Sequence, residues 1–207
     1  MGRKWVSPPR KGLWFTVLLR PLCPMQSAQR LTVMTAVAVT SSLRRNTGLP
    51  LRIKWPNDIL CRGRKVVGIL VELCAEGPHL QYAAIGIGID VNLEPSDFPS
   101  WLQASATSLK QEAGFPFHRP TLAIEVLREL DQCQSLLSDE NFPMLLEYWM
   151  ELDDTLGRQI SISWNDGRSL RGLASNLDFD GALLVRTDEG RLERVTAGDV
   201  TLEKEFL

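Results

Sequence analysis

The stretch Ile85-Gly86-Ile87-Gly88-Ile89-Asp90-Val91-Asn92 carries the strongest structural signal in the chain, because its alternate residues form two very different sets. Side chains alternate between the two faces of a β-strand. One face is apolar and β-branched throughout: Ile85, Ile87, Ile89 and Val91. The other has two positions without a side chain and then two polar groups: Gly86, Gly88, Asp90 and Asn92. The first face predicts packing against helices. The glycines indicate either a ligand that approaches the backbone closely or tight packing against another element.

Two neighbouring runs repeat this division. Residues 65–73 alternate an apolar set with Gly68 and Glu72, and residues 51–55 place Lys54 opposite an apolar set. In one sheet, these strands would have a sealed side and an open side with Lys54 at its edge. A single charge of this kind is normally a solvated surface group, and Lys54-Trp55-Pro56-Asn57-Asp58 alone could be a simple turn. The agreement of three strands favours a ligand site, where a lysine acts as a point charge against carboxylate or phosphate.

The rest of the chain divides into a helical middle and a strand-rich tail. Residues 13–20 predict a strand, residues 25–46 a long amphipathic helix, and residues 107–113, 121–137 and 142–152 three more helices. Asn57-Asp58 and residues 62–64 predict turns. After Gly157 the tail contains five short strands, separated by dipeptides such as Asp180-Gly181 and Glu189-Gly190. This pattern predicts a small barrel of the SH3 kind.

Composition excludes several classes of protein. The 207 residues have a net charge of −2, which argues against nucleic-acid binding because that normally needs a basic face. The sequence has no apolar run of about 20 residues and no secretory signal, so we expect a cytoplasmic chain without membrane contact. Its four cysteines and two histidines are widely spaced and predict neither disulfides nor a metal site.

In four ordered motifs the sequence resembles the biotin protein ligases, also called biotin–[acetyl-CoA-carboxylase] ligases. The motifs are Gly2-Arg3-Lys4-Trp5, Lys54-Trp55-Pro56-Asn57-Asp58, Gly68-Ile69-Leu70-Val71-Glu72 and residues 86–92. The resemblance implies an α+β fold, with a mixed β-sheet and helices packed on one face, as in class II aminoacyl-tRNA synthetases, followed by a small SH3-like β-barrel. It implies a catalytic domain over residues 1–156, incomplete at its N-terminus, and the barrel over residues 157–207.

The resemblance also implies a two-step reaction. Biotin and ATP give biotinyl-5'-adenylate, and the biotinyl group then passes to a lysine of a biotin carboxyl carrier protein, with Mg2+ neutralising the triphosphate. Lys54 matches the family's catalytic lysine. The biotin- and adenylate-binding residues that it implies are Arg3, Trp5, Lys54, Gly68, Gly86, Gly88, Asp90 and Asn92. Asn57, Asp58 and Glu72 support the motifs, and no residue of the chain is expected to ligate a metal.

The sequence departs from the family pattern in two respects. It begins inside the loop where the family has a Gly-Arg-Gly-Arg run, so we expect an N-terminally shortened chain, and it is too short for a DNA-binding domain. Asp90 stands where the family usually has Asn, which places a negative charge near the nucleotide. Two alternatives remain: a non-catalytic remnant that acts as a binding or dimerising module, with a homodimer as the candidate assembly, and a lipoate-type ligase. The Lys-Trp-Pro-Asn-Asp motif and the strand-rich tail disfavour the lipoate alternative.

Overall fold

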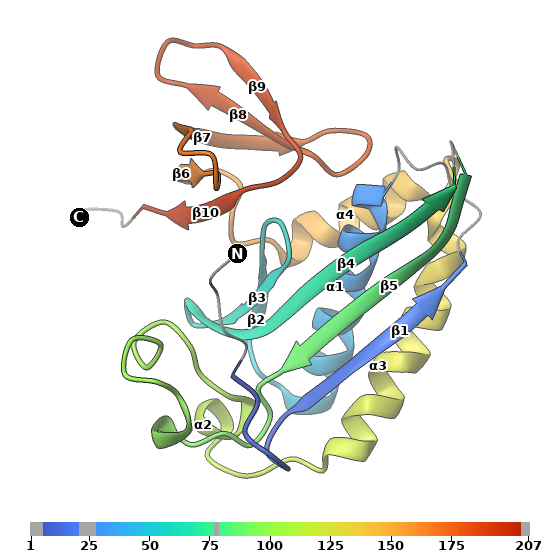
Figure 1. Ribbon diagram of the computed structural model, residues 1–207, viewed down its shortest axis with the longest axis vertical. Helices are drawn as coiled ribbons and strands as arrows, with labels where there is room; N and C mark the ends of the chain where they lie inside the picture. The colour runs from blue at the N-terminus through green and yellow to red at the C-terminus, as the bar shows by residue number, and fades with distance from the viewer. Residues whose placement is uncertain (1–5, 21–27, 77–78, 204–207) are drawn as a thin grey trace.

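The computed structural model describes residues 6–20, 28–76 and 79–203, which form two β-sheets and a set of helices (Figure 1). The first sheet has the strand order β1-β5-β4-β3-β2. Its strands are β1 Leu13–Leu19, β2 Leu51–Lys54, β3 Asp58–Cys61, β4 Arg64–Glu76 and β5 His79–Ile89. Neighbouring strands are antiparallel. Among the described residues, the parallel contacts of the predicted mixed sheet are two isolated bridges, Ile53–Asp153 and Lys65–Ala106.

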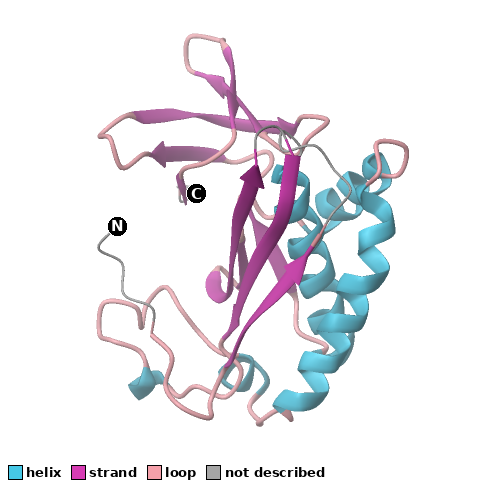
Figure 2. Ribbon diagram, turned by 45° about the vertical axis from the view of Figure 1, so that its right-hand side comes forward, coloured by secondary structure: helices cyan, strands magenta, loops and turns pink. Residues whose placement is uncertain are grey.

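Helices lie on one side of the first sheet (Figure 2). They are α1 Ala28–Thr47, α3 Arg119–Cys133 and α4 Phe142–Leu152, with α1 against the strands and both other helices packed on α1. The shorter elements are α2 Leu109–Ala113 and the 3-10 turns η2 Pro95–Asp97 and η3 Gln134–Leu137. Leu31, Met34 and Leu43 of α1 are fully buried. Burying each such side chain contributes about 1.5–3 kcal/mol, which offsets the low helix propensity of the Val and Thr residues in α1.

The two faces of the first sheet differ as predicted. Ile85, Ile87 and Ile89 of β5 point toward the helices and are at most 2% exposed. On the opposite face, Leu70 of β4 and Leu18 of β1 are 53% and 55% exposed. The prediction of one sealed and one open side is therefore confirmed. No helix in the described part of the chain is long and apolar enough to span a membrane.

One strand of this sheet is not predicted by the sequence patterns. β3 lies between the two predicted turns and pairs with both β2 and β4. Its pairing with β4 shifts register between Ile59 and Leu60. Four residues are too few to show a reliable alternation, so this strand is defined by its two partners and not by its own pattern.

The second sheet contains the five strands expected in the tail. They are β6 Gln159–Ser163, β7 Ser169–Leu177, β8 Leu183–Thr187, β9 Leu192–Val195 and β10 Asp199–Leu202. The order is β10-β6-β7-β8-β9, and neighbouring strands are antiparallel. Among the described residues the two outer strands, β9 and β10, do not pair with each other. Closure of this sheet into a barrel therefore stays a prediction.

The turn between β7 and β8 attaches the second sheet to the first layer. Asp180 in this turn forms an ion pair with the buried Arg30 of α1, with an N–O distance of 3.0 Å. The carbonyl oxygen of Gly181 accepts a hydrogen bond of 3.1 Å from the indole N–H of Trp55, which directly follows β2. Gly181 has φ +89°, and a Cβ there would lie 2.5 Å from a methyl group of Val33, so both backbone geometry and space require glycine.

Candidate active site

One row of directly paired residues that crosses all five strands of the first sheet contains Lys54. Lys54 is opposite Asp58, Asp58 is opposite Gly68, Gly68 is opposite Gly88, and Gly88 is opposite Trp14. Directly paired residues in antiparallel strands project from the same face. All five therefore belong to the open face, the side turned toward the viewer in Figure 1. The row has a lysine at one end, an aromatic ring at the other, and an aspartate and two glycines between them.

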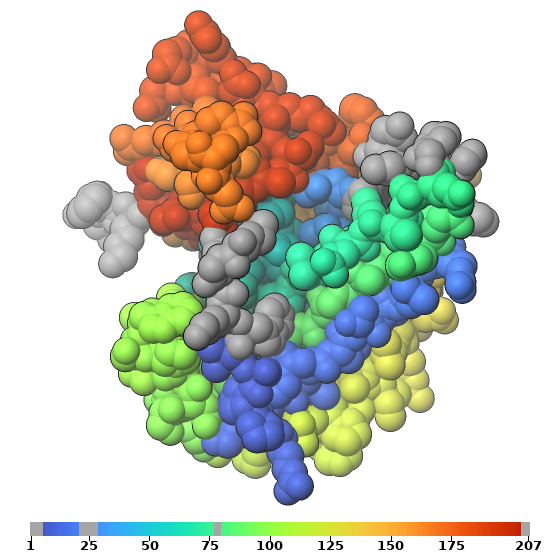
Figure 3. All heavy atoms as spheres, viewed as in Figure 1, coloured from blue at the N-terminus to red at the C-terminus, as the bar shows by residue number. Residues whose placement is uncertain are grey.

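Beside this row the open face is hollowed (Figure 3). The hollow has a volume of about 290 Å³ and is lined by Trp14, Phe15, Thr16, Leu70, Gly86 and Ile87. A Cβ on Gly86 would lie 3.6 Å from the carbonyl oxygen of Leu70, which is ordinary contact. Packing within the protein therefore does not require glycine at position 86. The open hollow favours the ligand interpretation of this glycine over the packing interpretation.

The Lys-Trp-Pro-Asn-Asp motif connects β2 to β3, and hydrogen bonds attach it to β4. Lys54 is the last residue of β2 and is half-buried. The peptide bond between Trp55 and Pro56 is cis. The side-chain amide of Asn57 donates a 2.5 Å hydrogen bond to the carbonyl oxygen of Ile69, and the N–H of Ile69 donates to the carbonyl oxygen of Asn57. Asn57 thus locks the turn onto β4.

Two carboxylates of the predicted site lie near Lys65. Asp58 forms an ion pair with this lysine. Asp90, half-buried just after β5, has no described hydrogen-bond donor to its carboxylate. Burial raises the pKa of Asp90 to about 7, and the positive charge of Lys65 opposes this rise only in part. Asp90 therefore exchanges a proton near neutral pH.

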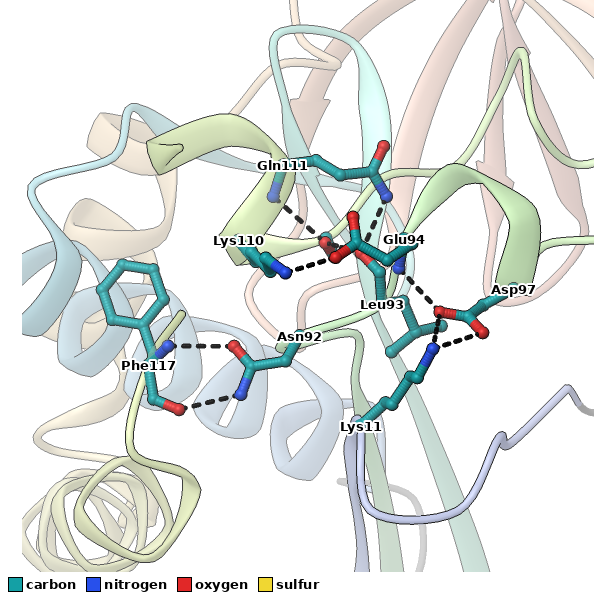
Figure 4. Close-up of polar contacts among 9 residues, drawn as sticks. Lys11, Asn92, Leu93, Glu94, Asp97, Lys110, Gln111 and Phe117 are labelled. Atoms are coloured by element: carbon teal, nitrogen blue, oxygen red, sulfur yellow. Dashed lines mark hydrogen bonds and ion pairs between the residues drawn. The ribbon is translucent and has the colours of Figure 1, made fainter. Parts of the chain in front are cut away.

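Asn92 holds the loop that leads into α3 (Figure 4). Its side-chain Nδ2 donates to the carbonyl oxygen of Phe117 and its Oδ1 accepts from the N–H of the same residue, both at 2.9 Å. Close by, an ion pair between Glu94 and Lys110 joins the segment after β5 to α2. The structure thus gives Asn92 an anchoring contact that the sequence does not predict, while its contact with an adenylate stays a prediction.

The remaining predicted residues are placed as follows. Gly68 is half-buried, Gly88 is buried, and Glu72 is exposed on the open face of β4. Arg3 and Trp5 lie outside the described residues. No group of three or more His, Cys, Asp or Glu residues that could hold a metal ion is found among the described residues.

Comparisons with known proteins match both sheets. Residues 1–90 match the Biotin/lipoate A/B protein ligase family, and residues 155–202 match the Biotin protein ligase C terminal domain. The chain is 35% identical to the Bifunctional ligase/repressor BirA of Bacillus subtilis over 98% of its own length and 62% of that protein. It therefore spans less than two thirds of the curated relatives of this type.

A second relative and a solved structure are matched over more of their own length. The Biotin--[acetyl-CoA-carboxylase] ligase of Paracoccus denitrificans is 31% identical, with 92% of this chain and 80% of that protein covered. The biotin protein ligase from Aquifex aeolicus, solved in complex with biotin and ATP, superposes with a TM-score of 0.82. That match has 26% identity and covers 99% of this chain and 83% of the other. By sequence and by fold, this chain belongs to the biotin protein ligase family.

Proposed function

We propose that this chain is an ATP-dependent ligase that forms biotinyl-5'-adenylate and transfers biotin to a lysine of a biotin carboxyl carrier protein. The observation that carries the proposal is the row from Lys54 to Trp14, with its two glycines and the adjoining hollow. The Aquifex relative with this fold was solved with biotin and ATP. A floor of glycines with Lys54 at its edge suits a small acid that must be activated.

Lys54 is proposed as the catalytic residue. In the first step a carboxylate oxygen of biotin attacks the α-phosphorus of ATP, and the bond to the β-phosphate breaks to release pyrophosphate. This brings two anions together and adds charge on the phosphorus in the transition state. A fixed cation that meets this charge stabilises the transition state more than the separated substrates. In the second step the acceptor amine attacks the carbonyl carbon, loses a proton and displaces AMP.

The hollow fits one part of such a ligand. Its volume of about 290 Å³ is near the lower end of ligand pockets, which span about 300–1,000 Å³. We assign biotin and the adenylate to the face formed by Gly68, Gly86 and Gly88. Mg2+ typically binds through one or two carboxylates together with substrate phosphates, so we expect it to be held largely by ATP. Its contribution would be to neutralise charge on the triphosphate.

The division of the chain also enters the proposal. We propose that residues 1–156 form the catalytic unit and residues 157–207 a C-terminal unit. The match of residues 155–202 to a separate C-terminal domain family supports this division.

Biotin-dependent exchange of labelled pyrophosphate into ATP tests the proposed function. We expect exchange by the 207-residue protein, and a loss of about 100- to 1,000-fold in kcat for Lys54→Ala, as for removal of a charge-stabilising group. Arg52→Ala is the matched control, because Arg52 is an exposed cation two residues earlier on β2. It should keep activity within about threefold, because an exposed cation outside the row contributes little to transition-state binding.

Three results would contradict the proposal. Full activity of a folded Lys54→Ala protein would remove Lys54 from its role. Exchange with lipoate in place of biotin would identify a lipoate-type ligase. Absence of exchange with either acid, together with no biotin binding in calorimetry, would favour a non-catalytic binding module.

A further inference from the structure

The connection between α4 and β6 runs along the outer edge of β2, beside Lys54. Asp153 forms a parallel bridge with Ile53. The N–H of Asp154 donates a 2.8 Å hydrogen bond to the carbonyl oxygen of Ile53. The N–H of Trp55 donates a 2.9 Å hydrogen bond to the side-chain oxygen of Thr155. Residues 153–155 therefore cover an edge strand whose polar groups would otherwise lack partners.

These hydrogen bonds hold the backbone on both sides of Lys54. In a strand, the N–H and C=O of one residue point to one side, and those of its two neighbours point to the other. Lys54 pairs with Asp58 of β3 on the inner side. On the outer side, the carbonyl oxygen of Ile53 and the N–H of Trp55 belong to the two peptide units that flank the Cα of Lys54. Both units are held by the connection, which restricts the backbone dihedral angles of Lys54.

Thr155 is itself held firmly in place. It is fully buried, and its N–H donates a 2.8 Å hydrogen bond to the carboxylate of Asp153. The other oxygen of that carboxylate accepts a 2.6 Å hydrogen bond from the N–H of Leu156. Burial raises the pKa of Asp153, and hydrogen bonds from Leu156 and Thr155 oppose the rise. The oxygen that receives the Trp55 N–H is thus fixed by contacts outside the first sheet.

We propose that Thr155 is a positioning residue for the adenylation step: its hydroxyl oxygen, by accepting the N–H of Trp55, fixes the backbone from which Lys54 reaches the open face. This inference rests on the proposed function of Lys54. A lysine side chain is long, so a small rotation at its Cα moves the ammonium group much further. A displacement of about 1 Å in a reacting group can lower a rate about 100-fold.

The test compares two substitutions at Thr155 with one at another buried threonine. Thr155→Val keeps the β-branched shape but removes the hydrogen-bond acceptor. Thr155→Ser keeps the acceptor and removes a methyl group. Thr40→Val is the matched control, because Thr40 is fully buried in α1 and its hydroxyl has no partner among the described residues. Pyrophosphate exchange is measured well below the melting temperature and normalised to active sites by the single-turnover yield of adenylate.

We expect Thr155→Val to lower kcat at least about tenfold while the KM for biotin changes less than about threefold. Thr155→Ser should recover most of the activity, and Thr40→Val should resemble the wild type. A purely structural role would reduce the number of active sites and leave kcat per site unchanged.

Either of two results would overturn the inference. One is a kcat for Thr155→Val within about threefold of the Thr40→Val value, because a displaced Lys54 should cost far more. The other is a Thr155→Ser variant as impaired as Thr155→Val. Lys54→Ala, assayed in parallel, distinguishes failure of the positioning role of Thr155 from failure of the proposed role of Lys54. If Lys54→Ala is inactive and Thr155→Val is normal, only the positioning role fails. If Lys54→Ala is fully active, the proposed role of Lys54 fails as well.

Discussion

Asp90 and Glu112 are carboxylates on neighbouring segments, and their surroundings give them different charge states. Burial favours protonation of Glu112, but hydrogen bonds and charges from Arg62, Thr107 and Arg64 outweigh it and lower its pKa. The Arg62 contact is 2.6 Å and the Arg64 contact 2.5 Å. Among the described residues, the charge of Lys65 alone opposes the effect of burial on Asp90, and its pKa is raised to about 7. A buried carboxylate thus stays ionised only where several donors surround it.

Asp90→Asn should therefore stabilise the protein in a pH-dependent way. The folded-state pKa lies above the ordinary value of 3.8, so the folded protein binds the proton more tightly than the unfolded chain. The ionised form is penalised, and this penalty is absent below about pH 4 and complete above about pH 8. We expect Asn to raise Tm by about 4 °C or more at pH 8 and to change it much less at pH 4, close to the ordinary pKa of 3.8.

The same variant tests the position of Asp90 relative to the nucleotide. Removing a negative charge near a triphosphate should leave ATP affinity equal or higher at pH 8. Thermal melts at both pH values and titration with ATP are the measurements. A Tm gain that is the same at pH 4 and pH 8, or a clear loss of ATP binding, would contradict this account of the site.

At the scale of the strand, two glycines illustrate different reasons for the absence of a side chain. Gly86 of β5 borders the hollow, where a Cβ would make only ordinary contacts. Gly172 of β7 is buried, and a Cβ there would lie 2.3 Å from the carbonyl oxygen of Arg186. The first glycine leaves room for a ligand, whereas the second allows two strands to approach each other.

Alanine substitutions should separate these two roles. Gly86→Ala should leave Tm unchanged or slightly raised, because alanine is favoured over glycine within a strand by about 0.5–1 kcal/mol. It should raise the KM for biotin, because the new methyl group enters the hollow. Gly172→Ala should lower Tm by about 4 °C or more and leave the KM for biotin unchanged at temperatures where the protein is folded. If Gly86→Ala leaves the KM unchanged, the hollow is not the biotin site.

The strands show which parts of the fold could be predicted. Alternation in residues 65–73 and 85–92 predicted both faces correctly, because side-chain direction in a strand is a local property. β3 could not be predicted, because Asn57-Asp58 is a strong turn signal and the strand depends on its pairing with β2 and β4. Its register shift at Ile59 and Leu60 likewise has no local signal.

The candidate site was predictable to the same extent. Face alternation predicts that Lys54, Gly68 and Gly88 share one face of the sheet. Their alignment in one row depends on the register between strands, which alternation does not predict. The contact of Asn92 with the backbone of Phe117 spans 25 positions, and that of Trp55 with Thr155 spans 100. Such contacts depend on where distant segments meet in the folded chain. No pattern near Thr155 distinguishes it from an ordinary loop threonine.

At the scale of the whole molecule, Arg30 joins three parts of the chain. Its guanidinium group contacts Asp180 of the second sheet at 3.0 Å and Asp139 before α4 at 2.5 Å. It also lies over the ring of Phe142, 4.7 Å from the centroid. The arginine side chain is 9% exposed and that of Asp180 is 13% exposed. Water therefore screens the ion pair between Arg30 and Asp180 much less than it screens an ion pair on the surface.

Arg30→Met should destabilise the entire protein, because it leaves the largely buried Asp180 without its main partner. We expect a loss of about 3 kcal/mol, or about 6–12 °C in Tm. Arg128→Ala is the control, because Arg128 pairs with Glu125 on the surface of α3 and is 68% exposed. Such pairs contribute about 0.2–1 kcal/mol. Calorimetric melts that show equal shifts for the two variants would refute the joining role of Arg30.

The placement of residues 153–155 against β2 has a practical consequence for dividing the chain. In sequence these residues follow the last helix of the first layer, yet their hydrogen bonds complete its sheet. A truncated gene product that stops at Leu152 would expose the backbone of a β-strand and should self-associate during expression. Extending the product by four residues, to Leu156, would retain that covering and favour recovery in solution.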